Sequence, residues 1–185
     1  MTCVVGIVEN GKVYMGADSA AVSDSSCTIR KDPKLFRKGD MLMGFSGPYR
    51  LGQVLRFDLT PPDKPTDMDD YEYLCTLFIE ELRNTLDDKG CMSEFNGMDD
   101  TGEANILIGW NGHLYRIDRD FQIGETVDRY DAIGSGEDLA RGVLYMLHHK
   151  GHMGRSPPKT RMHFALSAAQ YHSTAVREPF IYDEI

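Results

Sequence analysis

The sequence predicts an α+β fold, a four-layer αββα sandwich in which two antiparallel sheets lie face to face between pairs of helices. Segments with the apolar alternation of strands come in groups, and two pairs of segments with helical periodicity separate these groups. Each helix pair must bury an apolar stripe against a sheet face, and helices outside two stacked sheets meet that requirement. The chain of 185 residues is long enough for one sizeable core, so we expect a single domain, residues 1–185.

The first strands form a hairpin. Residues 2–8 and 13–18 are apolar runs, and Asn10-Gly11 between them is a strong short-range hairpin signal. A shorter antiparallel pair is expected from residues 28–30 and 34–36. Residues 104–110 and 113–118 are expected to form another hairpin about the turn Asn111-Gly112. The other expected strands are residues 41–45, a segment that ends at Gly134-Ser135-Gly136, and residues 180–182.

Four helices are expected. The first begins after Pro48, the second is capped by Thr66 with Asp69 three residues on, and the others span residues 137–149 and 159–174. Residues 88–103 are polar and predict a loop or a locally ordered excursion. The apolar stripes are Leu51, Val54, Leu55 and Leu59, then Leu74, Leu77, Phe78 and Leu82, then Leu139, Val143, Met146 and Leu147, and finally Met162, Ala165, Leu166 and Ala169.

The composition of the chain indicates which binding partners are excluded and in which cell compartment the protein is expected. A net charge of −9 without an evident basic patch argues against nucleic acid as the main partner. The four cysteines, which lack Cys-x-x-Cys spacing, predict reduced and mostly packed thiols of an intracellular protein. No apolar run reaches the length of a membrane span and no signal-peptide pattern opens the chain, so we expect a cytoplasmic protein without a membrane partner.

The second residue carries the main functional hypothesis. Removal of Met1 would place a hydroxyl and a free α-amine on Thr2. The amine, with an unperturbed pKa of about 8, can act as the base for its own hydroxyl. The hairpin would hold this end of the chain in a sheet and would bring Asp18, at the far end of the second strand, close to Thr2.

At these residues the sequence resembles a known family. Thr-Cys-Val-Val-Gly-Ile, then Asn-Gly-Lys-Val and Gly-Ala-Asp-Ser, resemble the start of a proteasome β-type subunit. They are most similar to HslV and to short proteasome-like proteins of bacteria and phages. Three later segments match in the same order, and the match runs to the final strand apart from about residues 58–103. These segments are Asp32-Pro33-Lys34-Leu35-Phe36, Gly44-Phe45-Ser46-Gly47 and Ala132-Ile133-Gly134-Ser135-Gly136.

The resemblance implies an N-terminal-nucleophile (Ntn) hydrolase fold and a role for five residues. Thr2 is the nucleophile, Lys34 lowers the pKa values of its amine and hydroxyl, and Asp18 positions Lys34. The Gly47 amide stabilises the oxyanion. Ser135 either supports the nucleophile's amine or caps the following helix. The alternatives are a surface ion pair of Asp18 and Lys34, worth at most about 1 kcal/mol, and a glycine at 47 needed only for a turn.

The last helix departs from the family pattern. His172 stands where eukaryotic-type subunits carry an aspartate, which the HslV type also lacks. The resemblance implies a cation, Na⁺ or Mg²⁺, held by the backbone carbonyls of Ala169, His172 and Ala175. No cofactor is required for the chemistry.

Two other polar clusters are interpreted without a metal. His148, His149 and His152 lie at a helix end, where the helix dipole favours histidine. The acids at 67, 69, 70 and 72 lack the central glycine of a calcium loop and predict a solvated helix start.

The predicted function is that of a threonine-type Ntn peptidase that hydrolyses peptides or unfolded proteins. The resemblance implies a homo-oligomeric ring and allows an AAA+ unfoldase ATPase as partner. This chain has no Gly-x-x-x-x-Gly-Lys-Ser/Thr loop, so any ATP use belongs to another chain. The alternatives are a catalytically inactive assembly subunit and an Ntn amidase that acts on a small amide.

Overall fold

The computed structural model describes residues 2–23, 26–95, 98–102, 104–149 and 156–185. Its helices are α1 (Tyr49–Phe57), α2 (Asp70–Tyr73), a π-helical turn (Leu74–Phe78), α3 (Ile79–Asp88), α4 (Glu137–His149) and α5 (Pro158–His172). Its strands are β1 (Val4–Glu9), β2 (Lys12–Ala17), β3 (Ala20–Ser23), β4 (Ser26–Ile29), β5 (Leu35–Lys38), β6 (Met41–Ser46), β7 (Ser93–Phe95), β8 (Met98–Asp100), β9 (Asn105–Trp110), β10 (His113–Ile117), β11 (Ile123–Glu125), β12 (Tyr130–Ile133) and β13 (Ile181–Glu184).

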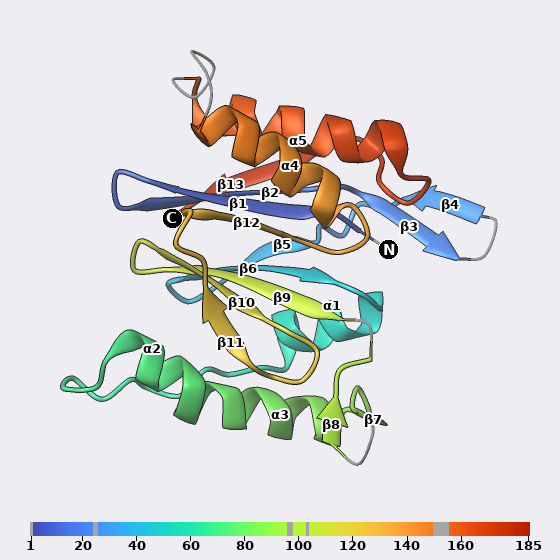
Figure 1. The fold of residues 1–185 in the computed structure, drawn as a ribbon. Helices are drawn as coiled ribbons and strands as arrows, with labels where there is room; N and C mark the ends of the chain where they lie inside the picture. Colours follow the sequence, from blue (N-terminus) through green and yellow to red (C-terminus); the bar gives the residue numbers. More distant parts are fainter. Residues whose placement is uncertain (1, 24–25, 96–97, 103, 150–155) are drawn as a thin grey trace.

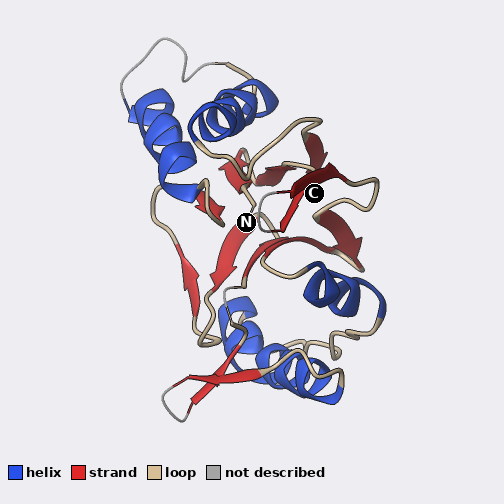
Figure 2. Ribbon diagram, turned by 90° about the vertical axis from the view of Figure 1, so that its right-hand side faces the viewer, coloured by secondary structure: helices blue, strands red, loops and turns tan. Residues whose placement is uncertain are grey.

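Two antiparallel sheets form the centre of the fold. One has the strand order β12-β1-β2-β13 and the other has the order β11-β10-β9-β6-β5. Figure 1 shows α4 and α5 over the first sheet, and α1 and α3 on the outer side of the second. Figure 2 also shows the helices in two groups with strands between them. The α+β class predicted from the sequence is confirmed.

Three apolar clusters fill the spaces between these elements. Val4, Met15, Leu42 and Leu107 belong to the cluster in which side chains of the two sheets meet. A second cluster joins α4 and α5 to the first sheet, and the largest joins α1 and α3 to the second sheet. The strands therefore bury both faces, and the start of β1 lies under protein on each side.

Asn-Gly turns fix the register of two hairpins. Asn10 and Gly11 have φ values of 53° and 74°, and Asn111 and Gly112 have values of 50° and 80°. Two consecutive positive φ values suit the type I′ turn, whose twist matches that of the paired strands. Both predicted hairpins are confirmed, with β1 paired to β2 and β9 paired to β10.

The predicted pairing of residues 28–30 with 34–36 is wrong. Strand β4 pairs instead with β3, in the two-stranded ribbon that projects from the body in Figure 1. Leu35 and Phe36 pair with β6 in the second sheet, where both side chains are buried. Pro33 has no N–H for a ladder hydrogen bond, and burial of the two apolar residues favours the larger sheet.

The cap of the second predicted helix is Asp69 rather than Thr66. The Asp69 carboxylate accepts hydrogen bonds from the N–H groups of Tyr71 and Glu72, at 2.9 and 3.2 Å. Aspartate is as good an N-cap as threonine, and the acceptor one turn closer to the apolar stripe satisfies the helix start.

Leu77 is the exception in the second apolar stripe. Leu74, Phe78 and Leu82 are fully buried as predicted, whereas Leu77 is 36% exposed. The π-helical turn over Leu74–Phe78 adds residues to one turn and changes the direction in which Leu77 points. A pattern of strict 3.6-residue periodicity cannot predict that change.

The predicted stripe of α4 is wrong for two of its four residues, whereas that of α5 is confirmed. Val143 packs against the second cluster and Leu147 is half-buried. Leu139 and Met146 are 37% and 54% exposed, and Ala140 and Leu144 are buried instead. Helix α5 buries Met162, Ala165, Leu166 and Ala169.

The remaining differences in secondary structure are local. A hairpin of β7 and β8 lies within residues 88–103, β11 follows β10, and the last strand begins at Ile181.

All four cysteines are free. Cys3 is buried and Cys91 is half-buried, but Cys27 and Cys75 are exposed, so the prediction of mostly packed thiols fails for these two. None of the helices in the described ranges has the length and apolar character needed to cross a membrane.

Neighbouring residues in the π-helical turn provide a stability test. Phe78→Ala is expected to lower the free energy of unfolding by about 3–5 kcal/mol because it opens a cavity in a fully buried cluster. Leu77→Ala, one residue earlier, is expected to cost less than half as much. Urea unfolding followed by circular dichroism measures both. Equal losses would show that Leu77 is buried as strict helical periodicity predicts.

Candidate active site

Thr2 lies just before β1 and is 1% exposed. Its N–H donates to Ser135 Oγ at 3.2 Å, and its carbonyl accepts the Gly136 N–H at 3.2 Å. Ser135 Oγ also lies 3.4 Å from the Thr2 carbonyl oxygen. The predicted removal of Met1 concerns a residue outside those described. The nitrogen that would become the α-amine of Thr2 is held by the turn between β12 and α4.

The Asp18 carboxylate is the hub of the site. It follows β2, its side chain is fully buried, and each of its oxygens accepts two hydrogen bonds. Oδ1 accepts from Lys34 Nζ at 2.7 Å and from the Cys3 N–H at 3.0 Å. Oδ2 accepts from the N–H groups of Ala20 at 3.0 Å and Arg177 at 3.4 Å. These four donors offset the cost of removing a negative charge from water.

Lys34 precedes β5 and is buried, with 1% of its side chain exposed. Burial lowers the pKa of the Lys34 ammonium, and the adjacent Asp18 carboxylate opposes that shift. The Tyr49 ring lies 5.9 Å from Nζ. The pair of Asp18 and Lys34 is therefore a buried ion pair and not the exposed surface pair that was the alternative interpretation.

Glycine at 134 permits the close approach of three segments. Its φ is +93°, and a Cβ there would lie 2.5 Å from the Thr2 carbonyl oxygen and 3.2 Å from Ser46 Cβ. Any side chain would force apart the end of β12, the start of β1 and the end of β6. The close packing of these three segments therefore requires the glycine at 134. Ser135, the next residue, lies beside Thr2 as predicted.

Gly47 follows Ser46 directly after β6. Its φ is +107°, and a Cβ there would lie 2.8 Å from Ala104 Cβ, so both conformation and space require glycine. These constraints account for the residue without catalysis. The use of its N–H as an oxyanion donor stays a prediction.

Four of the five predicted catalytic residues are connected by short contacts. Thr2 contacts Ser135, its neighbour Cys3 contacts Asp18, and Asp18 contacts Lys34. Burial and the Asp18 charge raise the pKa of the Cys3 thiol, which keeps it a neutral, packed group beside Thr2.

Sequence analysis missed two residues beside this site. Tyr49 covers Lys34 and donates from its hydroxyl to the Ala20 carbonyl at 3.4 Å, with the Arg30 guanidinium 4.2 Å from its ring centroid. Burial raises the pKa of Tyr49 to about 12, so the phenol stays neutral. Arg177 reaches Asp18 through its backbone N–H. No spacing in the sequence signals either contact, because each depends on which loops meet.

One of the three carbonyls predicted to hold a cation already accepts a hydrogen bond. The Ala169 carbonyl accepts the Ser173 N–H at 2.9 Å in the last hydrogen bond of α5. The carbonyls of Gln170, Ser173 and Val176, each one residue further along the chain, are contacted by the Arg177 side chain. The cation site at Ala169, His172 and Ala175 stays a prediction.

Other polar clusters have packing partners. The rings of His148 and Tyr130 lie 5.6 Å apart, and those of His149 and Tyr145 lie 4.6 Å apart. His152 lies outside the described residues. Within the described part of the chain, no three His, Cys, Asp or Glu side chains are grouped as metal ligands.

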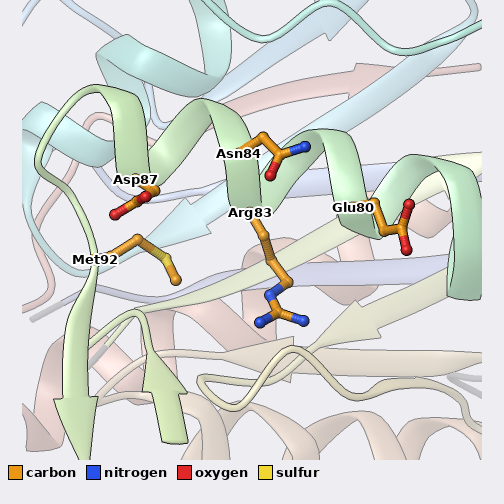
Figure 3. Close-up of a pocket in the computed structure, with 5 residues that line it drawn as sticks. All are labelled: Glu80, Arg83, Asn84, Asp87 and Met92. Carbon is orange, nitrogen blue, oxygen red and sulfur yellow. The ribbon is translucent and has the colours of Figure 1, made fainter.

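Of two surface pockets, one lies apart from the candidate active site and the other lies next to it. One is lined by Glu80, Arg83, Asn84, Asp87 and Met92, and Figure 3 shows four of these side chains projecting from α3. It contains none of the predicted catalytic residues. The other lies beside Lys34 and is lined by Asp32, Pro33, Phe45, Tyr49, Gly52, Gln53, Arg56 and Phe57.

The chain has the same fold as solved proteins that include HslV and Anbu, which agrees at the level of the fold with the resemblance found in the sequence. BPH of Thiobacillus denitrificans, solved in complex with epoxomicin, matches with a TM-score of 0.80 at 16% identity, over 100% of this chain and 98% of that one. HslV of Trypanosoma brucei matches with 0.68 at 15% identity, over 99% and 98%. An Anbu mutant from Hyphomicrobium sp. strain MC1 matches with 0.69 at 13% identity, over 98% and 80%. No protein-family model and no curated protein matches the sequence.

The buried pair predicts an unequal response to two aspartate substitutions. Asp18→Ala leaves the Lys34 ammonium buried without its carboxylate and is expected to cost about 3–5 kcal/mol of unfolding free energy. Asp32→Ala removes the carboxylate from a half-exposed pair with Arg30 and is expected to cost far less. Chemical denaturation at neutral pH measures both. A loss for Asp18→Ala no larger than that for Asp32→Ala would contradict the buried pair.

Proposed function

We propose that this protein is a threonine-type Ntn hydrolase that cleaves peptide bonds, with Thr2 as its nucleophile. The observation that carries the proposal is the buried contact between Lys34 and Asp18, joined to Cys3 beside a buried Thr2. A buried ion pair is costly, and a structural role at this position could be filled by apolar residues at no loss of stability. Its place next to a hydroxyl residue favours a catalytic use.

The proposed reaction begins once Thr2 is N-terminal. Its α-amine accepts the proton of Oγ1 as that oxygen attacks the carbonyl carbon of the scissile peptide bond. The nearby Lys34 charge favours the unprotonated amine and the developing alkoxide. The amine then gives the proton to the leaving nitrogen, and water hydrolyses the resulting ester by the same route in reverse.

Two further groups have proposed supporting roles. Ser135 Oγ, 3.2 Å from the Thr2 nitrogen, can hold the amine with its lone pair directed toward the hydroxyl. The Gly47 N–H can donate to the oxyanion of the tetrahedral intermediate, a contact worth on the order of 100-fold in rate in other hydrolases. The pocket beside Lys34, with the rings of Phe45 and Tyr49 in its wall, is a proposed site for a substrate side chain.

The comparisons support the reaction class. We propose that the layers of helices and sheets form the four-layer αββα sandwich of Ntn hydrolases, in one domain over residues 1–185. BPH of Thiobacillus denitrificans, which has the same fold, is described in complex with epoxomicin. A related inhibitor is therefore a suitable probe of Thr2.

We also propose that the chain assembles with copies of itself into a ring. The support is the fold shared with HslV and with Anbu, the latter described as an ancestral β-subunit. Large apolar side chains are exposed on the outer faces of α4 and α5, among them Tyr145, Met146 and Phe164. We propose an unfoldase partner on the resemblance alone, and a cytoplasmic location on the cysteine pattern and the absence of a signal-peptide or membrane-span pattern in the sequence.

Covalent labelling by a peptide epoxyketone tests the proposal. This reagent needs a free amine and an adjacent hydroxyl to form its ring adduct, so intact mass spectrometry of protein with N-terminal Thr2 is expected to show one adduct per chain. Thr2→Ala is expected to show none, and Thr2→Ser is expected to react. Thr126→Ala, at a surface turn, is the matched control and should label as the parent does.

The other outcomes separate the rivals. Processed protein that forms no adduct and hydrolyses no peptide would contradict the proposed peptidase and indicate an inactive assembly subunit. Absence of an adduct together with hydrolysis of small amides, lost in Thr2→Ala, would indicate an amidase.

A further inference from the structure

Backbone carbonyls at the end of α5 and in the turn just after it converge on a single side chain. The last four carbonyls of a helix have no partner within it. Arg177 Nη1 lies 2.7 Å from the Ser173 carbonyl oxygen, 3.4 Å from that of Gln170 and 2.6 Å from that of Val176. Three carbonyls, spaced three residues apart along the chain, therefore converge on one cationic nitrogen.

This arrangement has the chemistry of a cation site. Backbone carbonyl oxygens are ligands for hard metal cations, and the C-terminal end of a helix carries a partial negative charge. A guanidinium has five donors, and its pKa is too high for it to lose its charge in proteins. The Arg177 side chain therefore supplies a permanent positive charge at a place where a metal ion would otherwise be suited.

The turn closed by this contact also holds the Asp18 segment. The Arg177 N–H reaches Asp18 Oδ2 at 3.4 Å, and the Arg177 carbonyl accepts the Ser19 N–H at 3.1 Å. On the next residue, the Glu178 N–H donates to Gln170 Oε1 at 2.7 Å. The side chain of Arg177 thus fixes a turn whose backbone contacts the hub of the candidate site.

We infer that Arg177 is an internal cation that takes the place of a bound metal ion at the end of α5 and positions the Asp18 segment. It is a positioning residue, because it contacts Asp18 only through its backbone. The consequence is that this protein needs no added metal for the stability of this region.

The test measures the melting temperature of the full chain in sodium, potassium, magnesium and choline chloride at equal ionic strength. The parent protein is expected to melt at the same temperature in all four. Arg177→Ala is expected to melt about 4–10 °C lower in choline chloride. Part of that loss should return with sodium or magnesium, or with low-millimolar guanidinium, because each can occupy the vacated carbonyls.

Two variants control for the loss of charge. Arg37→Ala removes a guanidinium that is bound mainly to the Asp183 carboxylate, and it is expected to show no cation-specific recovery. Arg177→Lys keeps a positive charge near the carbonyls and is expected to remain insensitive to the choice of cation.

Three results would overturn the inference. These are a melting temperature of the parent protein that rises specifically with sodium or magnesium, an Arg177→Ala protein that no small cation stabilises, and an Arg177→Lys protein that becomes cation-dependent. If Arg177→Ala does not fold, the melting temperatures of the parent protein and of Arg177→Lys in the four salts still test the inference. The readout is stability, so the result does not depend on whether Thr2 is catalytic.

Discussion

Burial of the Lys34 ammonium against the Asp18 carboxylate is the interaction on which the arrangement of this site depends. Desolvation of both charges is costly, and the structure offsets it with backbone N–H donors from three separate segments. Those segments are the start of β1, the start of β3 and the turn after α5. The ion pair therefore joins parts of the chain that lie far apart in sequence.

Glycine makes the same meeting point sterically possible. Gly134 brings the backbone of Thr2 against the ends of β12 and β6, at a distance that no Cβ would allow. Stacking of the two sheets then buries the start of β1 on both faces. Thr2 is therefore buried and hydrogen-bonded to Ser135, which suits the preorganisation that its proposed role as nucleophile requires.

Local signals in the sequence are sufficient for the two Asn-Gly hairpins, whereas the candidate site residues come from the family resemblance. Asn10-Gly11 and Asn111-Gly112 encode their turns through positive φ values, which few other residues adopt. The four residues Thr2, Asp18, Lys34 and Ser135 are predicted through the family resemblance. Pairing of β1 with β2 accounts for the contact of Asp18 with Cys3, whereas Lys34 and Ser135 come from the segments before β5 and after β12. Gly47 is predicted as well, and its positive φ together with the closeness of Ala104 accounts for the glycine without catalysis.

Features that depend on packing between distant segments could not be predicted in this way. The exposure of Leu77 follows from a π-helical turn, and α4 buries Ala140 and Leu144 rather than Leu139 and Met146. Strand β4 pairs with β3 because burial directs Leu35 into another sheet. The contacts of Arg177 depend on how the last turn folds back over α5, for which no periodicity exists.

The central claim is that the buried Lys34 charge prepares the amine of Thr2 to act as a base. The direct test is the pKa of that amine, measured by nitrogen-15 NMR on protein with N-terminal ¹⁵N-labelled Thr2. The account predicts a pKa below the unperturbed value of about 8, and a higher pKa in Lys34→Met. An amine pKa that is unperturbed, or that does not change in Lys34→Met, would contradict it.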